Sequence, residues 1–512
     1  MLIELRIDDR LRGPKAVTAA PVVATLLDAV SEADADPSRL RVVCDWLQYR
    51  HNFREPILLR PLLPSAVATA QADQDGCPAQ PNFELAIDLR RTGGLDLRAA
   101  LDAALRIAAP GGPRPQAVEA SAGAADDARP RCYLEDWQPG STSCIWGFNA
   151  LYWKALGLWE QATGHEYEHA LPGGESDARN VAAASEQIRK LFGIWDELAS
   201  RRALPAELHV LELGVGNGNQ ACVWLDEFQR LDRHLARDYY PRLQYLMGDY
   251  SPHVLERARA NVASHAERIS SLVLDATRPT ETLGFLRSKA FLVYISNVYD
   301  NLPTDEVAWL GGQLFRVQVR AYLADDAART IAAAHQLTVD ELPAMVARLR
   351  RLGPELLADA MPDRFPTPLA AVGLWRDVWQ ALLLDERYVP LEELDAHELA
   401  PEIGAEILLP LLEAHGDARV HVSNGALASF ADTLPLLHPM GMLECHDLFV
   451  TNLRQYAAGF RGPGKYDGSV VNWINGPLLA AVGKRHGFDV AFAQFAHRAA
   501  SNVVTLTTSL RD

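Results

Sequence analysis

The residues best suited to chemistry lie in one glycine-rich stretch, Leu211-Glu212-Leu213-Gly214-Val215-Gly216-Asn217-Gly218-Asn219. Glycine has no Cβ atom, so the backbone can turn sharply there and come close to a bound molecule. The stretch follows an apolar run and opens a helical pattern, and a helix N-terminus favours negatively charged ligand groups such as carboxylates. It is therefore either a loop that binds a nucleotide-like ligand or a tight turn between strand and helix.

Two aspartates follow the next two predicted strands. Asp249 ends the strand at 243–247 and could accept hydrogen bonds from both hydroxyls of a ribose, because one carboxylate can accept two donors. Asp275 ends the strand at 272–274 and would accept a hydrogen bond from an adenine amino group. Either aspartate alone is more often a helix cap or a solvated carboxylate, but their order along successive strands favours a cofactor site.

The elements that must position these groups alternate between strand and helix from residue 206 onward. We predict strands at 208–213, 243–247, 272–274 and 291–295 and helices at 220–231 and 252–265. This alternation indicates a doubly wound, mostly parallel α/β sheet with crossover helices. Ligands bind such sheets at the carboxyl ends of the strands, where the glycine loop and both aspartates fall.

The rest of the chain divides into further predicted units. These are a small N-terminal α/β domain (1–108), a linker rich in Pro, Gly and Ala (109–130), an aromatic-rich helical segment (131–205), a core in two parts (206–321 and 413–512) and a helical insertion (322–412). The aromatic residues form either a stacking surface for a substrate or a packed helical core. The N-terminal domain and the insertion could recognise and cover a substrate, the insertion as a lid.

The glycine loop has the pattern ExGxGxG and is similar to motif I of class I S-adenosylmethionine-dependent methyltransferases. The dinucleotide pattern GxGxxG would need a glycine at 219, where this chain has Asn219. The resemblance implies a Rossmann-like fold with S-adenosyl-L-methionine as cofactor, and an acid near the loop that pairs with the cofactor's ammonium. The implied cofactor-binding residues are Glu212, Gly214, Gly216, Gly218, Asn219, Asp249, Tyr250, Ser251, Asp275, Ala276 and Asn297.

Four further segments resemble one family of protein arginine methyltransferases, the mitochondrial complex I assembly methyltransferase and its bacterial relatives. The matching segments are 183–193, 296–303, 437–447 and 462–473, in the family's order. The family has Asn-Glu where this chain has Asn297-Val298. Without that glutamate, the family's arginine acceptor is one alternative among several. The acceptor stays open among nitrogen and oxygen nucleophiles of peptides, proteins (arginine included) and specialised metabolites.

Three residues are candidates for acting on the acceptor. Asp300 could orient the acceptor or act as a base, or it could cap the helix predicted just after it. Tyr299 would face the acceptor beside it. His446 is a second candidate base, or else a histidine satisfied at a strand end. Tyr466 and Asp467 lie in a Gly-Pro-Gly loop that forms either a pocket wall or a plain turn.

Composition excludes several classes of function. The 512 residues carry a net charge of −17, which disfavours binding to nucleic acid or to an anionic membrane. The six cysteines show no CxxC spacing, so we predict no disulfide framework and no metal site. No secretory h-region and no apolar run of about 18 residues are present, and we expect a cytoplasmic protein. A homodimer stays open.

Three functions fit these observations. The first is a methyltransferase with a small-molecule, peptide or protein acceptor. The second is an assembly or binding factor that keeps the cofactor pocket without turnover, which the missing glutamate at position 298 favours. The third is a nicotinamide-dependent oxidoreductase, against which Asn219 and the ordered Asp249 and Asp275 argue.

Overall fold

The structure is a computed structural model. It describes residues 2–6, 15–32, 40–45, 52–61, 83–89, 91, 95–108, 130–167, 180–310, 312–391, 398–413, 418–457, 462–497 and 502–511. The predicted linker 109–130 lies outside the described residues except for its last position. Among the described residues, no helix is long and apolar enough to cross a membrane. The same residues contain no group of three or more His, Cys, Asp or Glu side chains that could hold a metal ion.

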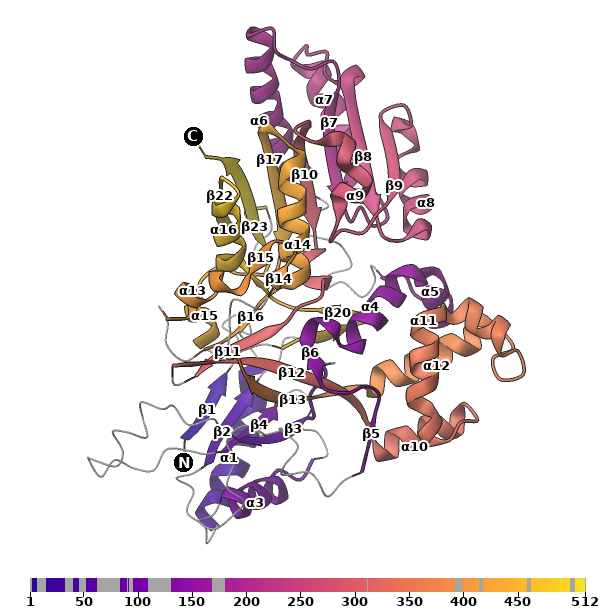
Figure 1. Cartoon of the computed structure of the whole chain (residues 1–512), viewed down its shortest axis with the longest axis vertical. Helices are drawn as coiled ribbons and strands as arrows, with labels where there is room; N and C mark the ends of the chain where they lie inside the picture. The colour runs from indigo at the N-terminus through magenta and orange to yellow at the C-terminus, as the bar shows by residue number, and fades with distance from the viewer. Residues whose placement is uncertain are drawn as a thin grey trace, which may run out of the picture.

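A seven-stranded sheet forms the upper part of the molecule (Figure 1). Its strands, in spatial order, are β22 (Phe488–Gln494), β23 (Val504–Leu510), β17 (Leu437–Asp447), β10 (Ala290–Ser296), β7 (Leu208–Leu213), β8 (Leu243–Asp249) and β9 (Ile269–Val273). The strands from β9 to β17 run parallel, whereas β23 is antiparallel to both neighbours. The predicted doubly wound, mostly parallel sheet is thus confirmed.

The strand order separates this sheet from the usual dinucleotide-binding arrangement. Numbered by appearance in the chain and read from β9, the order is 3-2-1-4-5-7-6. The dinucleotide-binding order is 3-2-1-4-5-6, so here an antiparallel strand is inserted between the fifth and sixth strands. This insertion argues against the oxidoreductase alternative.

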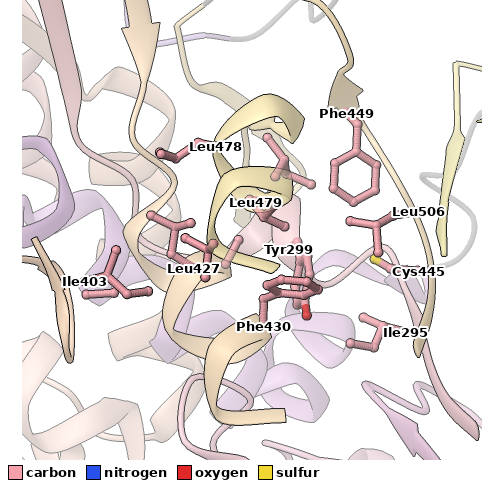
Figure 2. Packing of buried hydrophobic residues seen from close by; sticks show 14 of the residues in the cluster. Ile295, Tyr299, Ile403, Leu427, Phe430, Cys445, Phe449, Leu478, Leu479 and Leu506 are labelled. Atoms are coloured by element: carbon pink, nitrogen blue, oxygen red, sulfur yellow. The ribbon is translucent and has the colours of Figure 1, made fainter. Parts of the chain in front are cut away.

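Helices cover both faces of the core sheet, as expected for parallel strands. The main ones are α6 (Val181–Ser200), α7 (Asn219–His234), α8 (Pro252–Asn261), α14 (Asn424–Thr433) and α16 (Gly476–Arg485). Along β7, Val210 packs in the cluster that includes residues of α6 and α7, and Leu211 packs in the cluster that includes residues of α14 and α16. Figure 2 shows the second cluster, with Phe430 and Leu479 meeting residues of β10 and β17.

A second sheet lies below the first and corrects the predicted division of the chain (Figure 1). It consists of β13 (Leu383–Pro390), β12 (Gln313–Ala324), β11 (Glu306–Leu310) and β16 (Ala418–His421), with β5 (Arg131–Tyr133) and β6 (Gln138–Pro139) paired to β12. The segment 322–412 is therefore not wholly helical, and the second sheet extends into both segments expected to form the core. Burial along β12 alternates with the period of two that is typical of a strand. In the sequence, this strand is hard to recognise because an Ala- and Leu-rich helical pattern follows it directly.

Helices α10 (Asp325–Ala334), α11 (Leu342–Ala360) and α12 (Pro368–Ala381) do occur in this segment. They pack with α4 (Cys144–Lys154) and α5 (Leu156–Thr163), which lie between them and the core sheet (Figure 1). Phe148, Tyr152 and Trp159 are buried in this cluster. For these aromatic residues the packed-core interpretation is correct.

The N-terminal unit is a separate four-stranded sheet with two helices. Its elements are β1 (Leu2–Arg6), β2 (Leu40–Asp45), β4 (Phe83–Asp88), β3 (Ile57–Pro61), α1 (Lys15–Glu32) and α3 (Leu97–Ala108). The unit contacts the rest of the chain through Phe53, whose carbonyl accepts from the Leu384 N–H at 2.9 Å. The Phe53 ring meets Trp379 edge-on, with 5.5 Å between ring centroids. Its contacts through Phe53 are thus with β13 and α12, outside the core sheet.

Candidate functional site

The glycine loop joins β7 to α7 and depends on glycine at three alternate positions. Gly214, Gly216 and Gly218 have φ angles of +75°, +57° and +79°, a region that side chains disfavour. A Cβ atom on Gly216 would lie 2.8 Å from the hydroxyl oxygen of Tyr167, and one on Gly214 would collide with Val298. The loop therefore offers bare backbone to whatever lies against it.

Asp249 lies beside the loop, as the sequence predicts. Its two carboxylate oxygens accept from the N–H groups of Gly216 at 3.2 Å and Ser251 at 3.0 Å. Desolvation of the carboxylate raises the pKa of Asp249 to about 6, although these backbone donors oppose the shift. Each oxygen has a second lone pair, so the carboxylate can still accept the hydroxyls of a ribose.

Glu212 is buried within β7 beneath the loop. Its carboxylate accepts from the Tyr245 hydroxyl at 2.5 Å. Burial raises the pKa of Glu212 to about 8, so the side chain holds a proton at neutral pH. A neighbouring cation would lower that pKa, because opposite charge favours the ionised form. The ion pair with a cofactor ammonium stays a prediction.

The remaining predicted cofactor contacts follow β8 and β9. Ser251 is fully buried and caps α8 by accepting from the Val254 N–H at 3.3 Å, so its hydroxyl is used within the fold. The ring of Tyr250 is half-buried, with the Lys154 Nζ 5.1 Å from its centre. Asp275 is exposed and accepts from the Thr277 N–H at 2.8 Å and the Thr277 hydroxyl at 2.7 Å. Ala276 beside it is half-buried, and Asn219 begins α7 at the end of the loop.

The end of β10 is shaped by a residue to which the sequence analysis gave no role, Asp447. Its Oδ2 atom accepts from three successive N–H groups, of Val298 at 3.1 Å, Tyr299 at 2.8 Å and Asp300 at 3.4 Å. Asn297, just before this turn, is exposed and has φ +52°. The sequence does show that a carboxylate ends the strand next to β10. The candidate base named from the sequence was instead the neighbouring residue, His446.

Asp300 and Asp447 form a buried carboxyl pair. Burial, and then repulsion by the Asp447 carboxylate, hold the pKa of Asp300 well above its ordinary range. Burial raises the pKa of Asp447 to about 6 despite its backbone donors. Like charges this close cannot both ionise easily, so the Asp447 carboxylate disfavours ionisation of Asp300.

Tyr299 and His446 do not lie where an acceptor could reach them. Tyr299 is 1% exposed and packs against Phe430 and Leu427 in the core (Figure 2). His446 is buried, with Nδ1 2.9 Å from the Thr505 hydroxyl and Nε2 3.1 Å from a Glu444 oxygen. Both are correctly placed at the ends of strands, but their side chains point into the protein. For His446 the alternative of a satisfied histidine at a strand end fits the structure.

An aromatic wall containing a carboxylate lies beside the glycine loop. Tyr167 touches the loop, and its ring centre is 5.8 Å from that of Trp153. The neighbouring Tyr152 donates its hydroxyl to Asp467 at 3.0 Å, and the Trp159 indole N–H donates to the same oxygen at 3.0 Å. The Asp467 side chain is 13% exposed, which makes this carboxylate a candidate to meet an acceptor.

Asp467 is held in an unusual backbone conformation. Its φ is +49°, and its carbonyl accepts from the Trp379 indole N–H at 2.7 Å. It sits at the tip of the hairpin formed by β19 (Gly464–Tyr466) and β20 (Ser469–Val471). The same hairpin reaches the end of β10, because the Asn472 N–H donates to the Asp300 carbonyl at 2.9 Å. A non-glycine residue with positive φ persists only where its surroundings fix it.

Comparison with known proteins identifies the core. Residues 189–359 match the model of a family described as "Putative S-adenosyl-L-methionine-dependent methyltransferase". No curated protein matches the sequence. An uncharacterised Burkholderia thailandensis protein is 13% identical over 73% of this chain and 87% of its own (TM-score 0.43). A second structure from that organism, described as a "likely methyl transferase" bound to S-adenosyl-homocysteine, is 14% identical over 73% of this chain and 88% of its own (TM-score 0.42).

A 1,6-didemethyltoxoflavin-N1-methyltransferase of the same organism is more distant. It is 9% identical over 66% of this chain and 80% of its own, with a TM-score of 0.28.

Proposed function

We propose that this chain is a class I S-adenosylmethionine-dependent methyltransferase whose acceptor is a basic nitrogen held by Asp467. The match of residues 189–359 to a family described as "Putative S-adenosyl-L-methionine-dependent methyltransferase" supports the first part of this proposal. The acceptor class is a small molecule or a peptide side chain that carries an amine or a guanidine. The observation that carries this proposal is the Asp467 carboxylate, which Tyr152 and Trp159 hold in the aromatic cluster that reaches the glycine loop through Tyr167.

The residues of the glycine loop fit the methyl donor. Gly214, Gly216 and Gly218 have positive φ angles and carry no Cβ atom, so the loop can present its backbone to a ligand's amino-acid tail. Asp249 would hold the ribose, and the N-terminus of α7 favours a carboxylate. When bound, the sulfonium donor supplies an electrophilic methyl group, and the protein's own contribution is to align the acceptor.

Asp467 would serve the acceptor in two ways. A carboxylate attracts a protonated nitrogen and fixes its orientation. A nitrogen must lose its proton before it can attack, and a carboxylate within hydrogen-bond reach is able to accept that proton. His165 lies 3.8 Å from the second oxygen of Asp467 and completes this polar group.

The units outside the core sheet would complete the acceptor site. The hairpin with Asp467 is tied to α12 by Trp379 and to the N-terminal unit by the pairing of Asn52 with Gly464. We therefore assign acceptor recognition to the N-terminal unit together with the second sheet. As the sequence analysis predicts, we expect the protein to work in the cytoplasm, and a homodimer stays open.

A second candidate function is a binding factor that holds the donor without turnover. Asp300, Tyr299 and His446 are all engaged within the fold, so none of the three groups expected to act on the acceptor is available. Val298 stands where the resembling family has glutamate, and it packs against Gly214.

Transfer of a radiolabelled methyl group separates the two candidates. The protein is incubated with labelled S-adenosylmethionine and a cell lysate that has been split into small-molecule and protein fractions. We expect labelled product from the wild type, at least tenfold less from Asp467→Asn, and none from Gly216→Val. Calorimetry with S-adenosylhomocysteine is the control: Asp467→Asn should bind within twofold of the wild type, and Gly216→Val should not bind.

Each outcome has a distinct meaning. A wild type that binds S-adenosylhomocysteine but labels neither fraction would favour the binding factor. An Asp467→Asn variant that labels product at the wild-type rate would contradict the role of Asp467 in holding the acceptor. A Gly216→Val variant with unchanged affinity would contradict the cofactor site itself.

A further inference from the structure

A cavity of about 360 Å³ lies between α4 and the second sheet. Its walls are apolar where α4 contributes Ile145 and Trp146 and where β12 contributes Val317 and Val319. The Trp146 side chain has its polar atom satisfied, because the indole N–H donates to the Gly140 carbonyl at 3.0 Å. The volume falls within the usual range of ligand sites, about 300–1,000 Å³, and such walls favour an apolar group.

Two carboxylates also line this cavity, but one cation already pairs with both. Arg419 of β16 donates through Nε to Glu306 at 2.8 Å and through its Nη atoms to Glu386 at 2.8 and 2.9 Å. A cationic ligand would have to compete with this pairing, and breaking a buried ion pair is costly. The cavity is therefore better suited to a neutral group than to a cation.

Asn472 is the polar side chain that points to a ligand. It lines the cavity and is 3% exposed. Its Oδ1 accepts from the Trp473 N–H at 2.9 Å, which identifies the oxygen, since a backbone N–H can only donate. Its Nδ2 carries two hydrogens, and none of the residues that the structure describes accepts either of them. Because a buried donor without an acceptor is costly, a carbonyl oxygen in the cavity would satisfy it.

The cavity lies at the base of the hairpin whose tip carries Asp467. Pro463 directly precedes β19, Asn472 directly follows β20, and both line the cavity. The Asn472 N–H donates to the Asp300 carbonyl at 2.9 Å, so the cavity also adjoins the turn after β10. Five residue steps separate Asp467 from Asn472, and they span at most about 18 Å. This distance is short enough for one acceptor molecule to span.

A second hollow, of about 470 Å³, adjoins the first. The two share Leu384, Glu386 and Pro463 as lining residues. Phe53 and Glu55, which precede β3 of the N-terminal unit, line the second hollow. The N-terminal unit thus borders this region, as we expect if it helps to recognise the acceptor.

We propose that the cavity beside Asn472 binds the remote end of the acceptor, an apolar group joined to a carbonyl whose oxygen accepts from the Asn472 Nδ2. The acceptor is then an amide with a basic nitrogen at its other end, as in a lysine-containing peptide or an acylated diamine. The apolar walls hold the ring or alkyl group, Asn472 fixes the carbonyl, and Asp467 holds the nitrogen. This inference rests on the proposed function for the basic end alone, because the cavity and Asn472 do not involve the methyl donor.

Two probes test the inference by calorimetric titration of the intact protein. They are N-benzoyl-octanediamine and the acetylated peptide amide Phe-Gly-Gly-Lys, which present the same chemistry from two sources. We expect the wild type to bind at least one of them. Binding of the diamine alone would identify a small-molecule acceptor, and tighter binding of the peptide would identify a peptide acceptor.

Asn472→Leu nearly keeps the side-chain volume and removes the donor. We expect it to raise the Kd of the bound probe about fivefold or more, the effect of one lost hydrogen bond. Asn452→Leu is the matched control, because that exposed asparagine also accepts from a nearby backbone N–H, that of Arg454 at 2.9 Å, and does not line the cavity. Its Kd should stay within twofold of the wild type. Val319→Phe narrows the cavity from β12 and should raise the Kd about tenfold, which decides the question if circular dichroism shows that Asn472→Leu does not fold.

The inference and the proposed function can fail separately. A wild type that binds neither probe, or folded variants at Asn472 and Val319 that bind as tightly as the wild type, would overturn the inference. Methyl labelling by Asp467→Asn judges the proposed function. If Asn472→Leu weakens probe binding while Asp467→Asn labels product at the wild-type rate, the cavity site stands and the role of Asp467 is wrong.

Discussion

At the scale of single residues, burial decides which carboxyl groups of this site are charged. Glu212, Asp249 and Asp447 all have raised pKa values, which desolvation causes in each case. Asp300 is shifted well above its ordinary range because it also faces Asp447. The raised pKa values at the end of β10 follow from burial and from the pairing of Asp300 with Asp447, which a sequence does not reveal because it shows only residue types.

Replacing Asp300 by Asn tests this assignment. The folded protein binds a proton that the unfolded chain releases above about pH 4, so the wild type loses stability as pH rises from there toward the raised pKa of Asp300. Asparagine does not titrate and can still donate to Asp447. We expect the Tm of Asp300→Asn to match the wild type near pH 5 and to exceed it by about 2 °C or more at pH 9.

Differential scanning fluorimetry across that pH range provides the measurement. Asp325→Asn serves as control, because that aspartate begins α10 away from the pair and should leave the pH profile unchanged. Equal Tm values for Asp300→Asn and the wild type throughout pH 5 to pH 9 would show that Asp300 carries no raised pKa.

At the scale of elements, the ends of β7, β8 and β10 position the site, and the sequence predicts them unequally. The run Leu208–Leu213 is apolar because both faces of β7 are covered, so strand, loop and helix could be identified from local pattern alone. The side chains of Tyr299 and His446 are buried, which the sequence could not show because residue spacing does not reveal which way a side chain points. The second sheet was missed because β11 pairs with β16, more than 100 residues away.

Ser251 shows how a cap can resemble a ligand contact. Its hydroxyl is buried and caps α8. We expect Ser251→Ala to lower the free energy of unfolding by about 1 kcal/mol, the usual cost of a lost N-cap, and to change the affinity for S-adenosylhomocysteine less than twofold. Urea unfolding and calorimetry measure the two quantities. Ser270→Ala, on the exposed face of edge strand β9, should change neither. A tenfold loss of affinity at full stability would instead make Ser251 a cofactor contact.

At the scale of the whole molecule, three packed units meet around the hairpin that carries Asp467. Phe53 anchors the N-terminal unit by packing on Trp379, whose indole N–H in turn holds the Asp467 carbonyl. Lys465 lies in the same interface and donates to the carbonyls of Gln380 and Leu382. Burial lowers the pKa of Lys465 to about 7, so part of its population is neutral at physiological pH.

Truncation of Phe53 measures how strongly the units depend on one another. Phe53 is 2% exposed, and a buried Phe→Ala substitution costs about 3–5 kcal/mol. We expect Phe53→Ala to lower the free energy of unfolding, measured from the first urea transition, by that amount. Leu27→Ala, on a residue that is 51% exposed, should shift it by less than about 0.5 kcal/mol. Equal transitions for the two variants would mean that the N-terminal unit unfolds independently of this contact.

The long chain segment between β10 and β17 has a consequence for biosynthesis. Residues 297–436 are translated after β10 and before its neighbour β17. At roughly 5–20 residues per second, about 140 residues take the ribosome about 7–30 s. Throughout that interval the nascent sheet presents β10 as a bare, strongly apolar edge, the kind of surface that recruits chaperones or seeds aggregation. Ribosome profiling and holdase crosslinking would therefore register this protein as a client whose vulnerable period ends only when β17 leaves the exit tunnel.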